Sequence, residues 1–215
     1  MNQLLETIKK KYSELPSRPV LIAIDGNCGS GKTTLGNFLA KELNASLFHM
    51  DDFFLQPHQR TEERLAEPGG NVDYERFMEE ILEHISDANG ITFQPFSCSK
   101  WQLDDAVTIP YHDIVIVEGS YSQHPYFNNI YDIKIFLEIS LEEQKKRIIA
   151  RDGETIWPMF ENKWIPMENR YFEEFKIKEK STFTMSIGYS QSALLLAHNR
   201  IAANAACPMG LVCPT

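Results

Sequence analysis

Short apolar runs alternate along this chain with segments whose apolar residues recur at every third or fourth position. Four of the runs have the length expected of buried strands: 20–24, 45–50, 113–117 and 133–139. Segments with helical spacing stand before, between and after them: 2–14, 35–43, 74–85 and the stretches that begin at Ser140 and Pro158. Strands that alternate with helices predict an α/β fold of three layers, α/β/α, with a mostly parallel central sheet.

Local signals predict where several of these helices begin or end. Pro16 and Pro19 end the first helix, because proline lacks the N–H that a helix interior requires. Asn71 is expected to cap the helix that follows it. The residues from Ser140 to Glu143 form a capping box, and Pro158 suits the first turn of the last helix.

Two segments do not belong to the alternating pattern. Residues 55–71 are polar, contain two prolines and two glycines, and indicate a loop. Residues 91–96 and 106–109 predict a small β-hairpin around 97–105. The hairpin is expected to be an insertion beside the main sheet.

The turn after the first predicted strand carries the pattern G-x-x-x-x-G-K-[ST]. A strand, a glycine-rich turn and a helix N-terminus together form a cage of backbone N–H groups that suits phosphate. The side chain of Lys32 is expected to reach the β- and γ-phosphates, and the Thr33 hydroxyl to ligate Mg²⁺. The residues expected to bind the nucleotide are Gly26, Asn27, Cys28, Gly29, Ser30, Gly31, Lys32, Thr33 and Thr34. A glycine-rich turn of chance composition is the alternative, and the agreement of strand, motif and helix argues against it.

Carboxylates follow the ends of two other predicted strands. Asp51 and Asp52 come directly after the second strand, and Glu118 ends the third. Because the carboxyl ends of parallel strands lie along one edge of a sheet, these groups are expected to converge on the phosphate loop. One carboxylate of the Asp pair could accept the proton of a hydroxyl, and Glu118 suits the magnesium site. Ordinary turn or cap roles are the alternatives for all three residues.

Two arginines share one face of the helix that begins after Ser140. Arg147 and Arg151 stand four residues apart, directly before a Gly- and Pro-containing segment, so residues 147–158 are expected to form a lid over the phosphates. A surface ion pair between Arg147 and Glu143 is the alternative role for the first arginine.

Two further residues suit an acceptor site. Phe53 could form an apolar wall under the substrate, or belong to the core. Asp73 could accept hydrogen bonds from a sugar diol, or only complement the dipole of its helix. Lone histidines such as His49 and His124 are expected to be structural or exposed.

Composition limits the kinds of partner that the protein is expected to bind and the cellular compartment in which it is expected to work. A net charge of −9 argues against nucleic acid as the main partner. No apolar run approaches the ~20 residues that a membrane span requires, and the first residues are charged, so no membrane association is expected. The four cysteines form no C-x-x-C pair, and one of them, Cys28, lies in the phosphate loop. Reduced thiols and a cytoplasmic location are expected, and a homo-oligomer is left open.

The end of the chain differs in composition from the rest. Residues 189–215 contain a single charged side chain, Arg200, whereas residues 1–188 have the pattern of one α/β domain. The tail is either a docking helix or an extension that does not belong to the fold. Cys207 and Cys213 have no matching pair of ligands for a metal site.

Taken together, these motifs resemble the uridine kinase-like family of small-molecule P-loop kinases. The resemblance covers residues 19–180 and rests on six motifs: D-G-N-C-G-S-G-K-T-T, M-D-D-F-F, N-V-D-Y-E-R-F, I-V-E-G, the R-x-x-x-R helix end and I-W-P-M. It does not extend to uracil recognition, because residues 94–98 lack the Tyr-Asp pair of uridine kinases. The W-P-M segment is most similar to the nicotinamide riboside kinases, and the family's usual final strand and helix pattern is missing from the tail.

The resemblance implies a role for each candidate. Asp51 resembles the general base for a ribose 5′-hydroxyl, Glu118 the magnesium-site acid and Asp73 the acid that grips ribose hydroxyls. Arg147 and Arg151 resemble lid arginines. The expected activity is transfer of the γ-phosphate of ATP, with Mg²⁺, to a primary hydroxyl of a nucleoside or ribosyl compound.

Other functions are compatible with the same phosphate loop. Pantothenate or a sugar phosphate is the alternative acceptor within the kinase class. A regulatory P-loop ATPase or switch without a small-molecule acceptor is the alternative from another class, and an inactive nucleotide-binding module is a third. Neither an N-K-x-D guanine-reading motif nor an L-S-G-G-Q signature is present.

Overall fold

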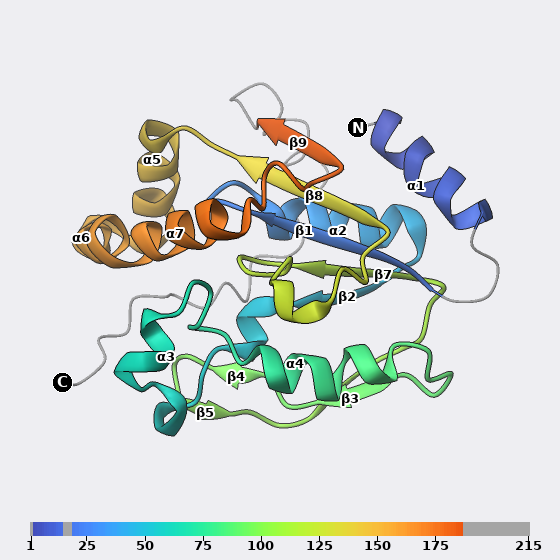
Figure 1. Ribbon diagram of the computed structural model, residues 1–215, viewed down its shortest axis with the longest axis horizontal. Helices are drawn as coiled ribbons and strands as arrows, with labels where there is room; N and C mark the ends of the chain where they lie inside the picture. Colours follow the sequence, from blue (N-terminus) through green and yellow to red (C-terminus); the bar gives the residue numbers. More distant parts are fainter. Residues whose placement is uncertain (1, 15–18, 187–215) are drawn as a thin grey trace.

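The computed structural model of the protein describes residues 2–14 and 19–186, and its centre is a parallel five-stranded sheet (Figure 1). The strands have the order β2-β7-β1-β8-β9, and each pairs with its neighbours in parallel. Their bounds are β1 (Val20–Gly26), β2 (Ser46–His49), β7 (Ile114–Glu118), β8 (Ile133–Glu138) and β9 (Phe183–Ser186). The predicted α/β fold with a mostly parallel central sheet is confirmed.

Alternate side chains of the central strand β1 face two different helical layers. Ile22 and Ile24 pack with residues of α1 (Asn2–Glu14) and α2 (Lys32–Leu43), whereas Leu21 and Ala23 pack with residues of α4 (Tyr74–Glu80) and α7 (Ile165–Phe175). Every residue of β1 is buried. A strand that is covered on both faces reads as a continuous apolar run, which is why the sequence identified it.

A third, smaller cluster packs beside the phosphate loop. Its members are Cys28, Ile148, Trp157, Phe160 and Ile165. They come from the loop, from α5 (Leu141–Asp152), and from one helical stretch made of α6 (Trp157–Met159), a π-helical turn (Phe160–Trp164) and α7. The predicted starts of these helices are confirmed: Ser140 caps α5 by accepting the Glu143 N–H, and Pro158 lies in the first turn of α6.

The segment between β2 and α4 is more ordered than a loop. It contains a 3₁₀ turn (Pro57–Gln59) and the short helix α3 (Glu62–Ala66), which Thr61 caps by accepting the Arg64 N–H. The cap of α4 is Asp73 and not Asn71, because the Asp73 side chain accepts the N–H of Arg76. The helix ends at Glu80, and a 3₁₀ turn (Leu82–His84) replaces its predicted last part.

The predicted hairpin is present and has two short ladders. The outer ladder pairs β3 (Ile91–Phe93) with β6 (Val107–Ile109), and the inner ladder pairs β4 (Phe96–Ser97) with β5 (Gln102–Leu103). The edge strand β9, which lies before the predicted tail, was missed from the sequence because it has only four residues and is half exposed. The tail itself, residues 189–215, lies outside the described residues.

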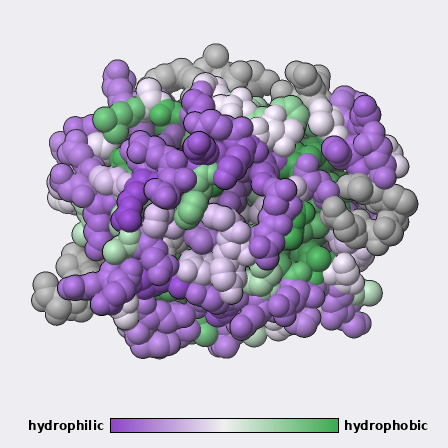
Figure 2. Space-filling model, viewed as in Figure 1, coloured by the Kyte–Doolittle hydropathy of each residue, from purple (hydrophilic) through white to green (hydrophobic). Residues whose placement is uncertain are grey.

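One face of the molecule is mainly polar. Hydrophilic residues cover most of the face seen in Figure 2, with smaller apolar areas between them. No described helix is long and apolar enough to cross a membrane.

Candidate active site

The phosphate loop is shaped by glycines that no other residue could replace without strain. Gly26, at the end of β1, has a φ of +134°, and a Cβ there would lie 2.0 Å from the carbonyl oxygen of Leu137 on β8. Gly31 has a φ of +97° and directly precedes the first turn of α2. The chain therefore wraps tightly, and the N-terminal N–H groups of α2 open into the loop.

The two side chains that the motif selects, Lys32 and Thr33, lie at the start of α2. Lys32 folds over the loop, and its Nζ donates to the carbonyl oxygens of Gly26 (2.7 Å) and Asn27 (3.1 Å). Thr33 lies in the first turn of α2 and is exposed.

An acidic cluster lies beside the loop. In the sheet register Glu118 stands opposite His49 of β2 and Ile24 of β1, so the carboxyl ends of the three strands lie side by side. Asp51 lies in the 3₁₀ turn η1 (Met50–Phe53) that follows β2. Burial, together with the negative charge of Glu118, raises the pKa of Asp51 to about 6, although Lys32 opposes this rise. The predicted convergence of Asp51, Glu118 and Lys32 is thus present.

A histidine that the sequence analysis did not select for the site completes this cluster. His49 Nδ1 lies 2.5 Å from Glu118 Oε1. Burial disfavours the charged imidazole, but the hydrogen bond to Glu118 raises the pKa of His49 above its ordinary value. A partner of this kind orients the carboxylate. Only the β2–β7 register reveals the contact, and that register is not readable from the sequence.

The donor set at the strand ends suits Mg²⁺. The groups on offer are the Thr33 hydroxyl and the carboxylate of Glu118, both oxygen donors. The negative charges of Asp51 and Asp52 interact with that of Glu118. No group of three or more His, Cys, Asp or Glu side chains that could hold a metal by itself was found among residues 2–14 and 19–186. Magnesium in nucleotide sites is held through one or two protein oxygens together with the phosphates.

The two predicted lid arginines have different hydrogen-bond partners. Arg147 Nε pairs with Glu143 Oε1 at 2.9 Å, and its Nη1 also reaches the carbonyl oxygen of Gly29 at 3.4 Å. Arg151, near the end of α5, pairs with Asp152 at 2.7 Å. The surface ion pair and the contact with the phosphate loop thus coexist for Arg147, whereas Arg151 remains a predicted phosphate ligand.

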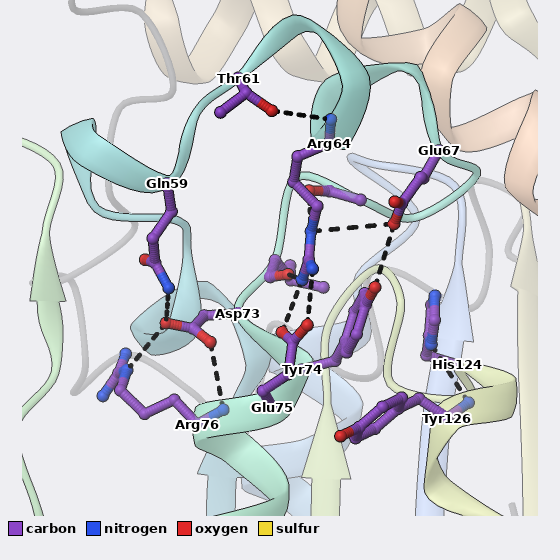
Figure 3. A network of polar contacts seen from close by, with 12 residues as sticks. Gln59, Thr61, Arg64, Glu67, Asp73, Tyr74, Glu75, Arg76, His124 and Tyr126 are labelled. Carbon is purple, nitrogen blue, oxygen red and sulfur yellow. Dashed lines mark hydrogen bonds and ion pairs between the residues drawn. The ribbon is translucent and has the colours of Figure 1, made fainter.

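The predicted acceptor residues differ in exposure. Phe53 is fully buried, stacks on Phe93 with ring centres 5.3 Å apart and meets Phe77 edge-on at 4.9 Å. Its side chain is therefore core, and the expected apolar wall under the substrate is not formed by it. Asp73 is 3% exposed, and its Oδ2 accepts a hydrogen bond from Gln59 Nε2 at 2.7 Å (Figure 3). Asp73 caps a helix, and its grip on a sugar remains a prediction.

Behind the phosphate loop lies a buried carboxylate that the sequence analysis missed. Glu168 of α7 accepts the Cys28 N–H at 2.9 Å with Oε2 and the Ser120 hydroxyl at 2.6 Å with Oε1. It joins the loop after β1 to the turn that follows Glu118. Glu168 could have been selected from the sequence because it is an acidic residue on the otherwise apolar face of the last helix.

Two more side chains fix the same region. Gln144 of α5 donates to the carbonyl oxygen of Cys28 at 2.9 Å. Asp25, the residue before the loop, accepts N–H groups of Gly26 and Gln123 and the hydroxyl of Tyr171. Burial raises the pKa of Asp25 to about 6 despite these donors. The loop is therefore held from behind by groups on several elements.

Glu168→Ala is expected to lower the melting temperature. It leaves the buried Cys28 N–H without its acceptor and the Ser120 hydroxyl with only a long contact to the carbonyl oxygen of Gly26. An unsatisfied buried donor costs roughly 1–3 kcal/mol, and each kcal/mol lowers the melting temperature by about 2–4 °C in a domain of this size. Glu173→Ala, on an exposed position of the same helix, is the control for differential scanning calorimetry. Equal melting of the two variants would show that the buried carboxylate does not hold the loop.

Comparisons with known proteins agree with this geometry. The family model described as shikimate kinase matches residues 28–94. A uridine kinase from Ureaplasma parvum serovar 3 is 27% identical over 196 residues, which cover 86% of this chain and 92% of that protein. The similarity to this uridine kinase thus extends over most of both chains.

Solved structures show the same fold. A possible uridine kinase from Bacillus stearothermophilus superposes with a TM-score of 0.61 at 18% identity, covering 85% of this chain and 99% of that one. D-glycerate 3-kinase from Cryptococcus neoformans var. grubii has a TM-score of 0.56 at 15% identity, covering 85% and 92%. At these identities the likeness concerns the fold alone.

Proposed function

This chain belongs to the uridine kinase-like family of P-loop kinases, and we propose that it transfers the γ-phosphate of ATP to the 5′-hydroxyl of a nucleoside or another ribosyl compound. The observation that carries this proposal is the convergence of the phosphate loop, Asp51 and Glu118 at three adjacent strand ends. Phosphoryl transfer requires a bound triphosphate, a group for the acceptor hydroxyl and neutralisation of charge.

The loop binds the triphosphate. The N–H groups at the start of α2 and the Lys32 ammonium suit the phosphate oxygens, and Arg147 approaches the same loop from α5. Thr33 and Glu118 would hold Mg²⁺, which neutralises charge on the phosphates when it is bound. Each of these groups stabilises negative charge that develops as the γ-phosphoryl group moves.

Asp51 serves the acceptor. The hydroxyl oxygen forms a bond to the γ-phosphorus, the bond from that phosphorus to the bridging oxygen of ADP breaks, and the hydroxyl proton passes to the Asp51 carboxylate. A carboxylate with a pKa of about 6 is ionised at neutral pH and still accepts a proton more readily than an ordinary aspartate.

The charge of the acceptor side favours an acceptor without a negative group. Asp51 and Asp52 lie on η1, where their charges interact with that of Glu118, and Asp73 lies at the start of α4. An anionic acceptor such as pantothenate or a sugar phosphate would be repelled by these carboxylates. A neutral or cationic ribosyl compound would not.

The loss of activity at acid pH is expected to reflect protonation of Asp51. Because the base must be ionised, kcat/KM for the acceptor is expected to rise as the pH rises through about 6 and to level off above it. The measurement is a pH profile of acceptor-dependent ADP release at low acceptor and saturating ATP·Mg²⁺. A profile that stays flat down to the ordinary pKa of an aspartate, about 3.9, would contradict a base with a raised pKa.

A substrate screen tests the proposal itself. Nucleosides and ribosylated bases are compared with pantothenate and sugar phosphates, first by thermal shift with ATP·Mg²⁺ and then by detection of the phosphorylated product. A ligand at 100 times its dissociation constant stabilises by about 2.7 kcal/mol. Product formed only from a ribosyl compound supports the proposal. ATP turnover that no acceptor increases would indicate the ATPase or switch instead.

A further inference from the structure

We infer that Arg76 is a positioning residue that couples Asp73, the carboxylate proposed to bind the acceptor, to the turn that carries Asp51. The inference rests on the proposed function, which assigns proton transfer to Asp51, and on the prediction that Asp73 binds a hydroxyl of the acceptor. Arg76 is 9% exposed and lies in the first turn of α4. Its guanidinium contacts three separate parts of the acceptor side.

The first contact is with the turn η1. Nη2 of Arg76 donates to the carbonyl oxygen of Asp52 at 2.8 Å, and the guanidinium carbon lies 4.2 Å from the centre of the Phe53 ring. This turn has no side-chain cap of its own. The arginine therefore supplies a fixed donor to the short segment that sets the direction of the Asp51 carboxylate.

The second contact is with Asp73. The main-chain N–H of Arg76 donates to Oδ1 at 3.1 Å, and its Nε lies 3.7 Å from Oδ2 (Figure 3). This Nε is buried and has no hydrogen-bond partner among the residues that the structure describes. Oδ2 already accepts a bond from Gln59. A hydroxyl that binds Asp73 changes the partners of this oxygen, and the unpartnered Nε is placed to respond with a small movement.

The third contact is with the hairpin. Nη1 donates to the carbonyl oxygen of Gln94 at 2.8 Å, between β3 and β4, and lies 3.2 Å from Glu80 of the same helix. One rigid, planar group thus joins η1 (the base-bearing turn, which carries Asp51), the carboxylate of Asp73 and the hairpin. A lysine at this position would keep the positive charge, but its single ammonium could not span the two carbonyl oxygens in the same way.

Arg64 provides a matched control. Its guanidinium also lies over a ring, 3.8 Å from the centre of Tyr74, and pairs with an acid of α4, Glu75, at 2.6 Å. It also donates to two carbonyl oxygens, those of Gly70 and Val72. These partners all belong to the segment 67–75 (Figure 3). Arg64 therefore has the same chemistry as Arg76 without contact with the base-bearing turn or the hairpin.

The test compares Arg76→Lys with Arg64→Lys in the full chain. Melting temperature, kcat, and the KM values for the acceptor and for ATP·Mg²⁺ are measured for both. We expect Arg76→Lys to lower kcat by roughly 10- to 100-fold and to raise the acceptor KM, as misplacement of a catalytic group does. Its KM for ATP·Mg²⁺ is expected to stay within about twofold of the parent. Arg64→Lys is expected to lower the melting temperature while its kinetic constants hardly change.

Asp73→Asn probes the same coupling from its other end and keeps a good helix cap. It is expected to lower kcat as well as to raise the acceptor KM. If Arg76→Lys does not fold, the kcat and acceptor KM of Asp73→Asn still test the coupling.

Three results would overturn the inference. They are equal kinetic losses in both arginine variants, a loss in Arg76→Lys confined to the KM for ATP·Mg²⁺, or an Asp73→Asn variant with a raised acceptor KM and the parent's kcat. A parent protein that phosphorylates no acceptor would instead refute the proposed function, and the inference with it. If the parent is active and Arg76→Lys and Arg64→Lys lose activity equally, the inference is refuted and the proposed function is not.

Discussion

Lys32→Ala is expected to lose acceptor phosphorylation almost completely while the protein remains folded. Among the described residues, the Nζ of Lys32 donates hydrogen bonds to carbonyl oxygens of its own loop, those of Gly26 and Asn27, so its removal breaks no hydrogen bond to another element. In the reaction the ammonium would face the β- and γ-phosphates. Loss of one such stabilising donor typically lowers kcat by about 10²–10³-fold. The measurement is kcat for product formation with ATP·Mg²⁺ and a saturating acceptor.

The control for this variant is Lys41→Ala. Lys41 lies in the last turn of the same helix, is exposed and is remote from the loop. It tests whether loss of any positive charge on α2 affects the rate. Circular dichroism and melting temperature are measured for both variants. Comparable kcat values in Lys32→Ala and the parent would remove Lys32 from the chemistry and with it the assignment of the loop.

The sequence was most informative where function depends on residues adjacent in the chain. The loop from Gly26 to Thr33 follows a strand that is buried on both faces, and both features are local. The convergence of Asp51 and Glu118 followed from a general rule, that the carboxyl ends of parallel strands share an edge. Neither inference required a contact between named side chains.

The groups that hold these residues in place were not predictable in the same way. His49 meets Glu118 only through the register of β2 on β7, and Glu168 reaches Cys28 from a residue 140 positions later. The cap of α4 was misassigned because Asn71 and Asp73 are both good cap residues two positions apart. Packing decides between such alternatives, and packing is set by the whole fold.

The same distinction applies to the acceptor side. Asp73 was selectable as an acid at a helix start, whereas the role of Arg76 depends on carbonyl oxygens 24 and 18 positions away. Phe53 suited both a substrate wall and the core, and three-dimensional packing against Phe77 and Phe93 makes it core. A sequence therefore identifies reactive groups more readily than the supports that orient them.

Asp51→Asn is expected to lower kcat by about 10²–10⁴-fold, the contribution of a positioned base, with little change in the affinity for ATP·Mg²⁺. Asparagine keeps the shape of the side chain but cannot take the hydroxyl proton. The turn η1 has no side-chain cap, so the substitution removes no cap interaction there. Isothermal titration with a non-hydrolysable ATP analogue separates binding from the rate.

Asp52→Asn is the matched control, because Asp52 neighbours Asp51 in the same turn and burial also raises its pKa. If Asp51 is the base, Asp52→Asn keeps most of the activity and the acid limb near pH 6. In Asp51→Asn the residual activity should lose that limb, since the group that titrates there is gone. A damaging Asp52→Asn beside a mild Asp51→Asn would transfer the role of base to Asp52. A limb that persists in Asp51→Asn would assign the titration to another group, for which His49, bonded to Glu118, is the nearest candidate.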